Sequence, residues 1–441
     1  MTISIVLQFV VVLAAIWKGA RYSGVGLGLW GAVGLLVLVV AFGVNPTSPP
    51  IDVMLIILAV IMAASVMDAA GGIDFLVRIA ERIIRANPKY VTIVAPLTTW
   101  SFTFVAGTGH IVYPLLPVIY ETAHQSGVRP ERPMAIATIA SQQAITASPV
   151  AAATAAMIGL FAEKGMTQWG LPQILMICVP ATLTGVIVAA IVSMFVGKDL
   201  KDDPEYQRRL AAGEIPAPKT AAERPPLQPA AKASAFVFLI GVALVVLFGF
   251  FPDLRTLPGQ KSALAMPIVI EILMLSVAAV MLLITKIEVN EIPKTPTLRA
   301  GVVAVIGIFG LAWLGDSFIA ANKDVIVPAI GAQADAHPWT FAFGLFFASV
   351  LLYSQAATTR ALMPLGIALG IPPQFLIAMF PSVNGYFFIP TYGSLIAAIN
   401  FDLSGTTKIG KYVLNHSFMI PGIVATAVAV TTGLFLAKIM F

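Results

Sequence analysis

Charged residues are scarce in this chain of 441 residues: they make up 11% of it, whereas 59% of the residues are hydrophobic. Soluble domains carry a charge at about a quarter of their positions, so this composition excludes an ordinary soluble protein. The long apolar runs reach about the 20 residues that a membrane-spanning helix needs, and the alternating pattern of barrel strands is absent. We therefore predict an all-α polytopic membrane protein.

Cysteine is almost absent too, since Cys178 is the only one and lies within an apolar run. This excludes disulfide and thiolate metal chemistry, and we expect neither a metal nor a cofactor. A nucleophile elbow and a Walker sequence for ATP are also missing. The sequence therefore predicts a secondary carrier or a channel, not an enzyme. The net charge of +5 is spread over loops, so no nucleic-acid partner is expected.

One segment, 197–232, interrupts the apolar composition, with thirteen charged residues and six prolines. Such a segment predicts a solvent-exposed linker, which divides the chain into the halves 1–196 and 233–441. Lys and Arg in short loops mark the cytoplasmic side of a membrane, and Lys18 and Arg21 follow the first apolar run. We expect a cytoplasmic linker and periplasmic N- and C-termini.

Each half contains two polar interruptions deep within apolar sequence. The interrupted segments are a hairpin at 91–120 and a broken helix at 133–161 in the first half, and a hairpin at 339–370, after a polar loop at 322–338, and a broken helix at 374–399 in the second. Basic residues flank 91–120 on both sides, which predicts a re-entrant hairpin. Broken helices at matching places predict two inverted repeats, each of about five transmembrane helices plus a re-entrant hairpin, with a substrate site at mid-membrane.

Residues 73–85, before the first hairpin, alternate apolar and charged side chains at near-helical spacing. This predicts an amphipathic helix at the membrane interface. It is either an ordinary juxtamembrane helix or an arm that lets a transport domain slide against a scaffold, and the sequence leaves both open.

The polar side chains of the four interruptions form the candidate substrate site. Helix N-termini and unwound backbone favour anions, and hydroxyl and amide groups add directional hydrogen bonds. For each single residue the alternative is packing between membrane helices. The candidates are Gly107, Thr108, Gly109, His110, Thr146, Ser148, Ser354, Gln355, Thr358, Thr359, Arg360, Asn384 and Thr391.

Among the candidates, Arg360 is the strongest charge in either break. A cation within the membrane is expensive and usually functional, although an ion pair with a carboxylate or snorkelling would also explain it. His110 could carry a proton or donate to substrate, or it could be a neutral side chain bonded to a carbonyl. Asp68, Glu271 and Asp316 are candidates for proton coupling or for structural pairing.

Eight short motifs extend the analysis across nearly the whole chain: Asn87–Tyr90, Gly107–His110, Arg129–Pro133, Ala147–Pro149, Ser354–Ala357, Pro390–Tyr392, Gly405–Thr407 with Ile409–Gly410, and Asn415–His416. Together they resemble the Dcu family of anaerobic four-carbon dicarboxylate transporters. The resemblance implies a bacterial inner-membrane carrier that exchanges fumarate, malate or aspartate for succinate and leaves room for proton-linked uptake. It also implies a homodimer with an architecture similar to elevator-type ion transporters.

The chain departs from that family at a few positions. Gly393 stands where the family pattern has proline, and Leu395 stands near an acidic residue of those members that regulate a sensor kinase. The resemblance therefore does not predict a sensor-kinase partner. Position 360 holds lysine or a neutral residue in the family, so Arg360 is a candidate for tuning selectivity, not an indispensable ligand.

These observations predict a transporter of C4-dicarboxylates, mainly a fumarate/succinate antiporter, whose site lies between two hairpin tips and two unwound helices. Small dicarboxylates, membrane lipid and a second copy of the chain are its expected partners. The alternatives are an anion channel and a membrane regulatory subunit.

Overall fold

The computed structural model of the chain describes residues 3–22, 25–215, 226–260, 262–352, 354–390, 392–412 and 414–441, without the side chains of residues 20 and 326–336. These residues fold almost entirely into helices, and the β pairing among them is one isolated bridge between Ile409 and His416. Seven of the described helical stretches are long and apolar enough to cross a membrane. The predicted all-α class is confirmed.

Three apolar helices begin the first half: α1 (Ile3–Tyr22), α2 (Gly26–Phe42) and α3 (Ile51–Ala69). A proline-rich loop joins α2 to α3, and the hydroxyl of Ser317 accepts a hydrogen bond from the N–H of Thr47 in it at 3.1 Å. This bond fastens the loop to a helix of the second half.

The predicted amphipathic helix is α4 (Gly72–Ala86). Its apolar face is buried, through Leu76, Val77, Ala80 and Ile84, and its charged residues lie on the other face. α4 packs against helices of both halves, because it contacts α5 (Val91–Ala106) and α11 (Ala231–Phe250). The role of a connecting arm stays a prediction.

The first helical hairpin consists of α5, the 3₁₀ helix η2 (Gly109–Leu115) and α6 (Leu116–Gln125), after a 3₁₀ turn η1 (Pro88–Tyr90). The chain reverses at Gly107, and the return arm ends five residues beyond the predicted end at residue 120. The broken helix follows as α7 (Glu131–Gln143), η3 (Ala144–Ala147) and α8 (Ala152–Glu163). Helix α9 (Leu171–Ser193) then leads to the linker.

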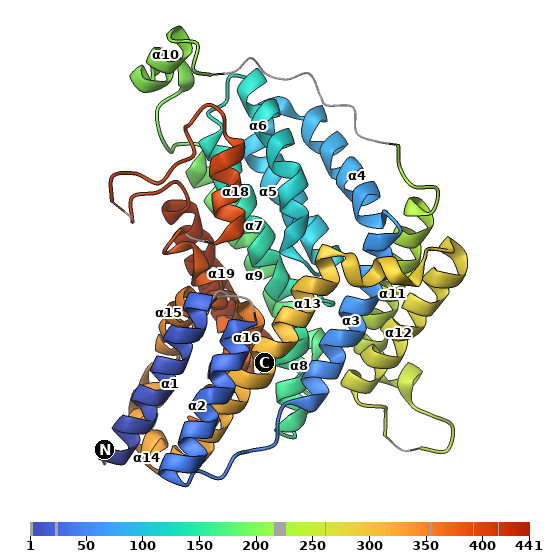
Figure 1. Ribbon diagram of the computed structural model, residues 1–441, viewed down its shortest axis with the longest axis vertical. Coiled ribbons are helices and arrows are strands. Elements are labelled where there is room, and N and C mark those ends of the chain that lie inside the picture. Colours follow the sequence, from blue (N-terminus) through green and yellow to red (C-terminus); the bar gives the residue numbers. More distant parts are fainter. Residues whose placement is uncertain are drawn as a thin grey trace.

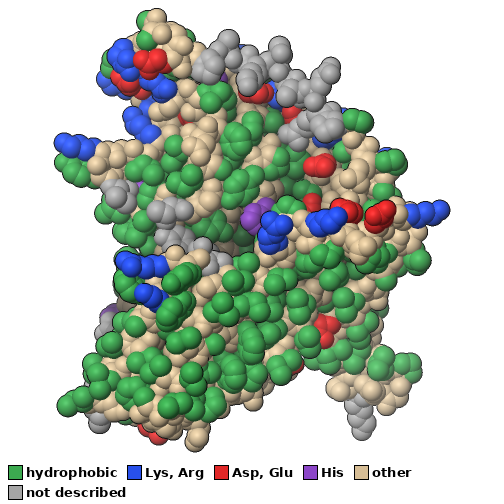
Figure 2. Space-filling model, viewed as in Figure 1, with side chains coloured by type: hydrophobic (Ala, Val, Ile, Leu, Met, Phe, Trp, Pro, Cys, Tyr) green, Lys and Arg blue, Asp and Glu red, His purple; other side chains and the backbone are tan. Residues whose placement is uncertain are grey.

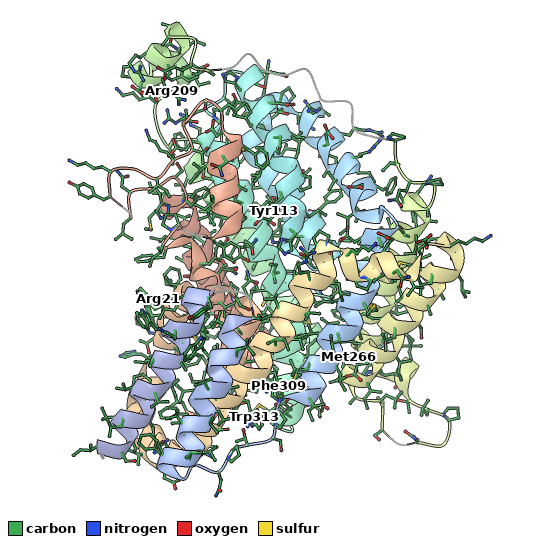
Figure 3. All side chains as sticks on the ribbon, viewed as in Figure 1. Arg21, Tyr113, Arg209, Met266, Phe309 and Trp313 are labelled. Carbon is green, nitrogen blue, oxygen red and sulfur yellow. The ribbon has the colours of Figure 1, made fainter. Side chains whose placement is uncertain are left out.

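Part of the predicted linker is folded. It contains η4 (Leu200–Asp202) and α10 (Pro204–Ala211), where Asp203 caps α10 and forms an ion pair with Arg129 at 2.5 Å. Arg209 of α10, labelled in Figure 3, donates to the carbonyl oxygen of Ser404 at 2.7 Å. The linker is therefore attached both to the base of the first hairpin and to the loop before the last helix.

The second half is also mainly helical in its described residues. It contains α11, η5 (Pro252–Arg255), α12 (Met266–Thr285), η6 (Val289–Lys294), α13 (Pro296–Gly307), the π-helical turn η7 (Ile308–Ala312), α14 (Trp313–Ala336), η8 (Pro338–Thr340), α15 (Phe341–Leu352), α16 (Gln355–Ala368), α17 (Pro373–Met379), η9 (Phe380–Phe387), α18 (Gly393–Phe401) and α19 (Met419–Met440). The inverted relation of the two halves stays a prediction.

The expected polar loop at 322–338 is wrong, since α14 continues to Ala336. Polar side chains are compatible with a helix wherever its backbone hydrogen bonds are satisfied internally. Polarity alone therefore did not locate the end of this helix.

Figure 1 shows the arrangement of the helices, which we divide into one group of α5–α9 and α15–α19 and a second group of α1–α3 and α11–α14. In the first group α9 lies along α19, α5 packs on α7, and α15 packs on η9. In the second group α1 and α2 pack on η7 and α14, and α3 packs on α12 and α13. Gly28 and Gly310 allow α2 to cross closely over the junction of α13 and η7. A side-chain carbon on Gly28 would collide with the backbone at the end of α13, and one on Gly310 would collide with the backbone of Gly28. We call these the hairpin group and the scaffold group.

Candidate functional site

A cavity of about 550 Å³ lies where the hairpin group faces α13 of the scaffold group. The turn after α5, the start of α8, the start of α16 and one face of α13 form its walls. Figure 2 shows a hollow at mid-height of the molecule, beside a histidine side chain and close to Lys and Arg side chains. Segments more than 280 residues apart in the sequence thus meet at one site, since Gly107 and Tyr392 both line it.

The first tip is held close to the broken helix by two glycines. Gly107 has a left-handed backbone (φ 70°), and a side-chain carbon there would lie 2.7 Å from the carbonyl oxygen of Val150. A side-chain carbon on Gly109 would collide with the side chain of Gln142. Thr108 accepts a hydrogen bond from the N–H of His110 at 3.3 Å, so its hydroxyl caps the return arm.

The second tip is the N-terminus of α16. Ser354 caps this helix, because its hydroxyl accepts from the N–H of Ala357 at 3.2 Å. The N–H groups of Gln355 and Ala356 in the first turn have no acceptor within the helix. Both residues line the cavity, so the positive end of a fourteen-residue helix lies at its wall.

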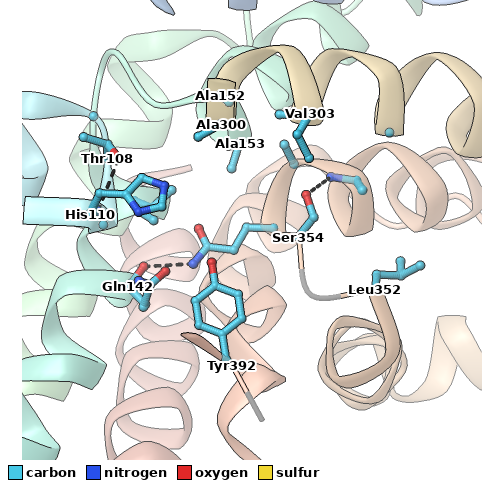
Figure 4. Close-up of a pocket in the computed structure, with 18 of the residues that line it drawn as sticks. Thr108, His110, Gln142, Ala152, Ala153, Ala300, Val303, Leu352, Ser354 and Tyr392 are labelled. Atoms are coloured by element: carbon cyan, nitrogen blue, oxygen red, sulfur yellow. Dashed lines mark hydrogen bonds between the residues drawn. The ribbon is translucent and has the colours of Figure 1, made fainter. Parts of the chain in front are cut away.

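The start of a second helix and a tyrosine also line the cavity. Ala152 and Ala153 begin α8, and Tyr392 precedes α18; all three residues line the cavity, and Figure 4 shows them around it. No carboxylate is among the described residues of the lining. Converging helix N-termini without acidic side chains favour the binding of an anion.

A chain of side-chain amides fixes the second tip against both broken helices. The side-chain nitrogen of Gln355 donates to the carbonyl oxygen of Gln142 at 3.1 Å and to the side-chain oxygen of Asn384. Asn384 donates in turn to Gln143 at 3.3 Å, and Gln143 donates to Thr426 of α19 at 2.8 Å. Asn384, a predicted ligand, therefore positions Gln355 and does not itself line the cavity.

Four predicted hydroxyl residues are completely buried and do not line the cavity. Thr358 and Thr359 donate to the carbonyl oxygens four residues earlier in α16. Thr146 donates to the carbonyl three residues earlier, and Ser148 accepts from the N–H two residues later. Each of these hydroxyl groups forms a hydrogen bond with a nearby backbone group. This agrees with a role in helix packing, the alternative that the sequence left open. The predicted ligand Thr391 lies outside the described residues.

Arg360 is also absent from the lining of this cavity. Its guanidinium is buried, with 1% of its side chain exposed, and forms ion pairs with Glu163 at 2.9 Å and with Asp316 at 3.3 Å. Paired carboxylates were the alternative explanation for this cation, and they are the arrangement that the structure shows. Arg299 of α13 is the single Lys or Arg among the described lining residues.

The whole chain agrees with one known family. Residues 4–441 match the sequence model of the family described as anaerobic C4-dicarboxylate membrane transporters. This chain belongs to that family. The predicted resemblance is confirmed.

Curated relatives support the same assignment. The chain is 42% identical over 437 residues to the C4-dicarboxylate transporter DcuA of Escherichia coli strain K12, covering 99% of this chain and all of the relative. It is 40% identical over 437 residues to DcuA of Wolinella succinogenes, with the same coverage. It is 38% identical over 433 residues to the anaerobic C4-dicarboxylate transporter DcuB of Escherichia coli O6:H1, covering 97% of each.

Among solved structures, the YdaH transporter of Alcanivorax borkumensis has a similar fold. The TM-score is 0.51 at 16% sequence identity, covering 93% of this chain and 89% of that one. At this identity the similarity concerns the arrangement of helices and not the substrate.

Sequence reasoning missed several lining residues, above all Arg299, Gln142 and Tyr392. A signal was present: small residues at Ala300, Ala304 and Gly307 recur at helical spacing beside Arg299 and leave space along one face of α13.

Proposed function

We propose that this protein is a secondary transporter that exchanges C4-dicarboxylates, among them fumarate, malate, aspartate and succinate, across the bacterial inner membrane. The observation that carries the proposal is the lining of the cavity between the hairpin tips and α13. The helices α8 and α16 begin there, the guanidinium-bearing Arg299 lines it, and its described lining has no carboxylate. Its volume of about 550 Å³ lies within the usual range of small-molecule sites, roughly 300–1,000 Å³.

The ligands in this proposal are the lining members of the predicted set. The first tip contributes Thr108 and His110, and the second contributes Ser354 and the N–H groups at the start of α16. A dianion loses its hydration shell on entering such a site, so each carboxylate needs fixed donors. Because the cavity has donors on opposite walls, each carboxylate of one dicarboxylate can bind at a different wall.

Transport in this proposal is an elevator motion in a homodimer, in which the hairpin group slides against the scaffold group. Contacts of α4 with α5 and α11 suit a connecting arm between the groups. The cavity lies between the two groups, so their relative displacement would carry the substrate from one side to the other.

Exchange in proteoliposomes tests the function. Vesicles with the purified protein are loaded with succinate or with buffer, and uptake of labelled fumarate is measured. An antiporter gives saturable uptake that internal succinate accelerates, whereas an anion channel gives uptake without that acceleration. An imposed pH gradient, with and without internal succinate, tests whether protons are coupled to uptake. Failure to bind or move any C4-dicarboxylate would refute the proposal.

The orientation in the inner membrane rests on the Lys and Arg distribution, with both termini periplasmic and the linker cytoplasmic. Ser48 and Ala212 are exposed and lie on opposite sides in this orientation. A cysteine at Ser48 should react with an impermeant thiol reagent in intact cells, and a cysteine at Ala212 should not. Cys178 is buried, so background labelling should be low. Labelling of the cysteine at Ala212 alone would show that the protein has the opposite orientation in the membrane.

A further inference from the structure

The two walls of the cavity differ in the charge that they can offer a ligand. The hairpin tips contribute backbone N–H groups and hydroxyls, with a partial charge of about half a unit at the end of each helix. The α13 wall contributes Arg299, whose planar guanidinium carries five N–H donors. A dicarboxylate carries close to two negative charges at neutral pH.

Arg299 is free to meet a ligand. Its side chain is exposed, and it makes no hydrogen bond or ion pair with any residue that the structure describes. Asp68, the acidic residue that contacts this end of α13, accepts a hydrogen bond from Thr297 at 2.7 Å and forms no ion pair with Arg299. Arg360, in contrast, is buried and forms ion pairs with two carboxylates.

We infer that Arg299 binds the second carboxylate of the substrate and thereby selects dianions over monoanions of the same size. The inference rests on the proposed function and adds to it the residue that recognises the second charge. A guanidinium can donate two parallel hydrogen bonds to one carboxylate, a geometry that neither an amide nor a single hydroxyl reproduces. The first carboxylate remains with the hairpin tips.

A charge that only attracts anions to the cytoplasmic face would behave differently. Lys286 provides the control, because it is exposed at the C-terminal end of α12, thirteen residues before Arg299 in the sequence, makes no described ion pair, and does not line the cavity. Arg299→Gln and Lys286→Gln each remove one positive charge from that face. Only the first removes a charge from the cavity.

The test compares succinate with succinamate, in which a neutral amide replaces one carboxylate at nearly the same size. Affinities are measured for the purified full-length protein as inhibition of labelled succinate binding. Arg299→Gln should weaken succinate binding by about tenfold or more, as expected for the loss of a charge-assisted hydrogen bond, and succinamate binding by less than about twofold. Arg299→Lys should fall between the wild type and Arg299→Gln, and Lys286→Gln should behave as the wild type.

Chemical labelling of a second variant restores a positive charge at position 299. The single native cysteine is buried, so Arg299→Cys can be labelled selectively with a thiol reagent that adds a quaternary ammonium group. This reagent should recover part of the preference for succinate, and a neutral reagent of similar size should not. If the preference for succinate over succinamate stays unchanged in Arg299→Gln, or falls equally in Lys286→Gln, the inference is refuted. A wild type that binds neither ligand would refute the proposed function instead.

Discussion

Gln355 donates a hydrogen bond from its side-chain nitrogen to the backbone carbonyl oxygen of Gln142, 213 residues away in the sequence, at 3.1 Å. The contact joins the tip of the second hairpin to the broken helix of the first half beside the cavity. Gln355 is 9% exposed, and its side-chain nitrogen also donates to Asn384 of the second broken helix, so one amide links both broken helices. The geometry of the candidate site therefore belongs to both halves together.

Removing this contact should weaken substrate binding. Gln355→Ala removes one donor from the Gln142 carbonyl oxygen, a hydrogen bond of about 0.5–1.5 kcal/mol, and releases the tip that the amide chain holds. We expect succinate affinity to fall by roughly tenfold, measured by equilibrium binding. Thr358→Ala serves as the control, since the Thr358 hydroxyl bonds only within α16 and does not line the cavity. Equal affinities in both variants would exclude Gln355 from the site.

Replacing Arg360 should change stability more than affinity. Arg360→Ala leaves Glu163 and Asp316 without their cation, and breaking a buried pair in this way costs about 3–5 kcal/mol. We expect a clearly lower melting temperature in detergent, with succinate affinity of the folded fraction changed by less than about threefold. Adding Glu163→Gln and Asp316→Asn should recover part of the stability. A stable Arg360→Ala protein that loses succinate binding would return Arg360 to the list of ligands.

A covalent bond between the two groups of helices should stop transport. Gly315 of α14 and Ala361 of α16 are neighbours, because a side-chain carbon on Gly315 would lie 3.8 Å from the Cα atom of Ala361. Such proximity suits a disulfide between cysteines at these two positions. Oxidation of the double variant should abolish exchange while succinate still binds, and reduction should restore exchange.

The single variants Gly315→Cys and Ala361→Cys serve as controls for that cross-link and should keep exchanging under oxidation. The native Cys178 is buried and lies on α9, so it does not compete for either position. Normal exchange with the cross-link fully formed would exclude a displacement of α16 against α14.

Acid should release the linker from the base of the first hairpin. Burial raises the pKa of Asp203, but hydrogen bonds from Arg129 and from the N–H groups of Tyr206 and Glu205 outweigh it, so the pKa is lowered below 3.8. A lowered pKa in the folded protein means that the stabilisation is complete above the ordinary pKa and is lost as the pH falls through the lowered value. Asp203→Asn should remove it at neutral pH.

Protease sensitivity of the linker measures this effect. Cleavage near α10 should be faster in Asp203→Asn than in the wild type at pH 7, and equally fast in both once Asp203 is protonated. Asp202→Asn is the matched control, because Asp202 carries the same charge one residue earlier without a described ion pair to Arg129. Faster cleavage in both variants would point to net charge instead of the Arg129 contact.

Local features of the sequence predicted the positions of the tips. Gly107 ends α5 in a left-handed conformation, and Ser354 caps α16 through its own hydroxyl, and both features depend only on neighbouring residues. The same holds for α4, whose two faces follow from helical spacing. The end of α14 could not be predicted from local sequence, because polar residues can either continue or end a helix.

What the sequence by itself determined is the membrane class, the family and the two polar tips, since composition and capping act over a few residues. Only the tertiary structure decided which polar groups line the cavity. A hydroxyl such as that of Thr359 can bond its own helix or a ligand equally well, and an arginine such as Arg360 can bind a substrate or a carboxylate of the protein. Packing determines these partners, because it buried Arg360 between Glu163 and Asp316 and left Arg299 exposed on the α13 wall of the cavity.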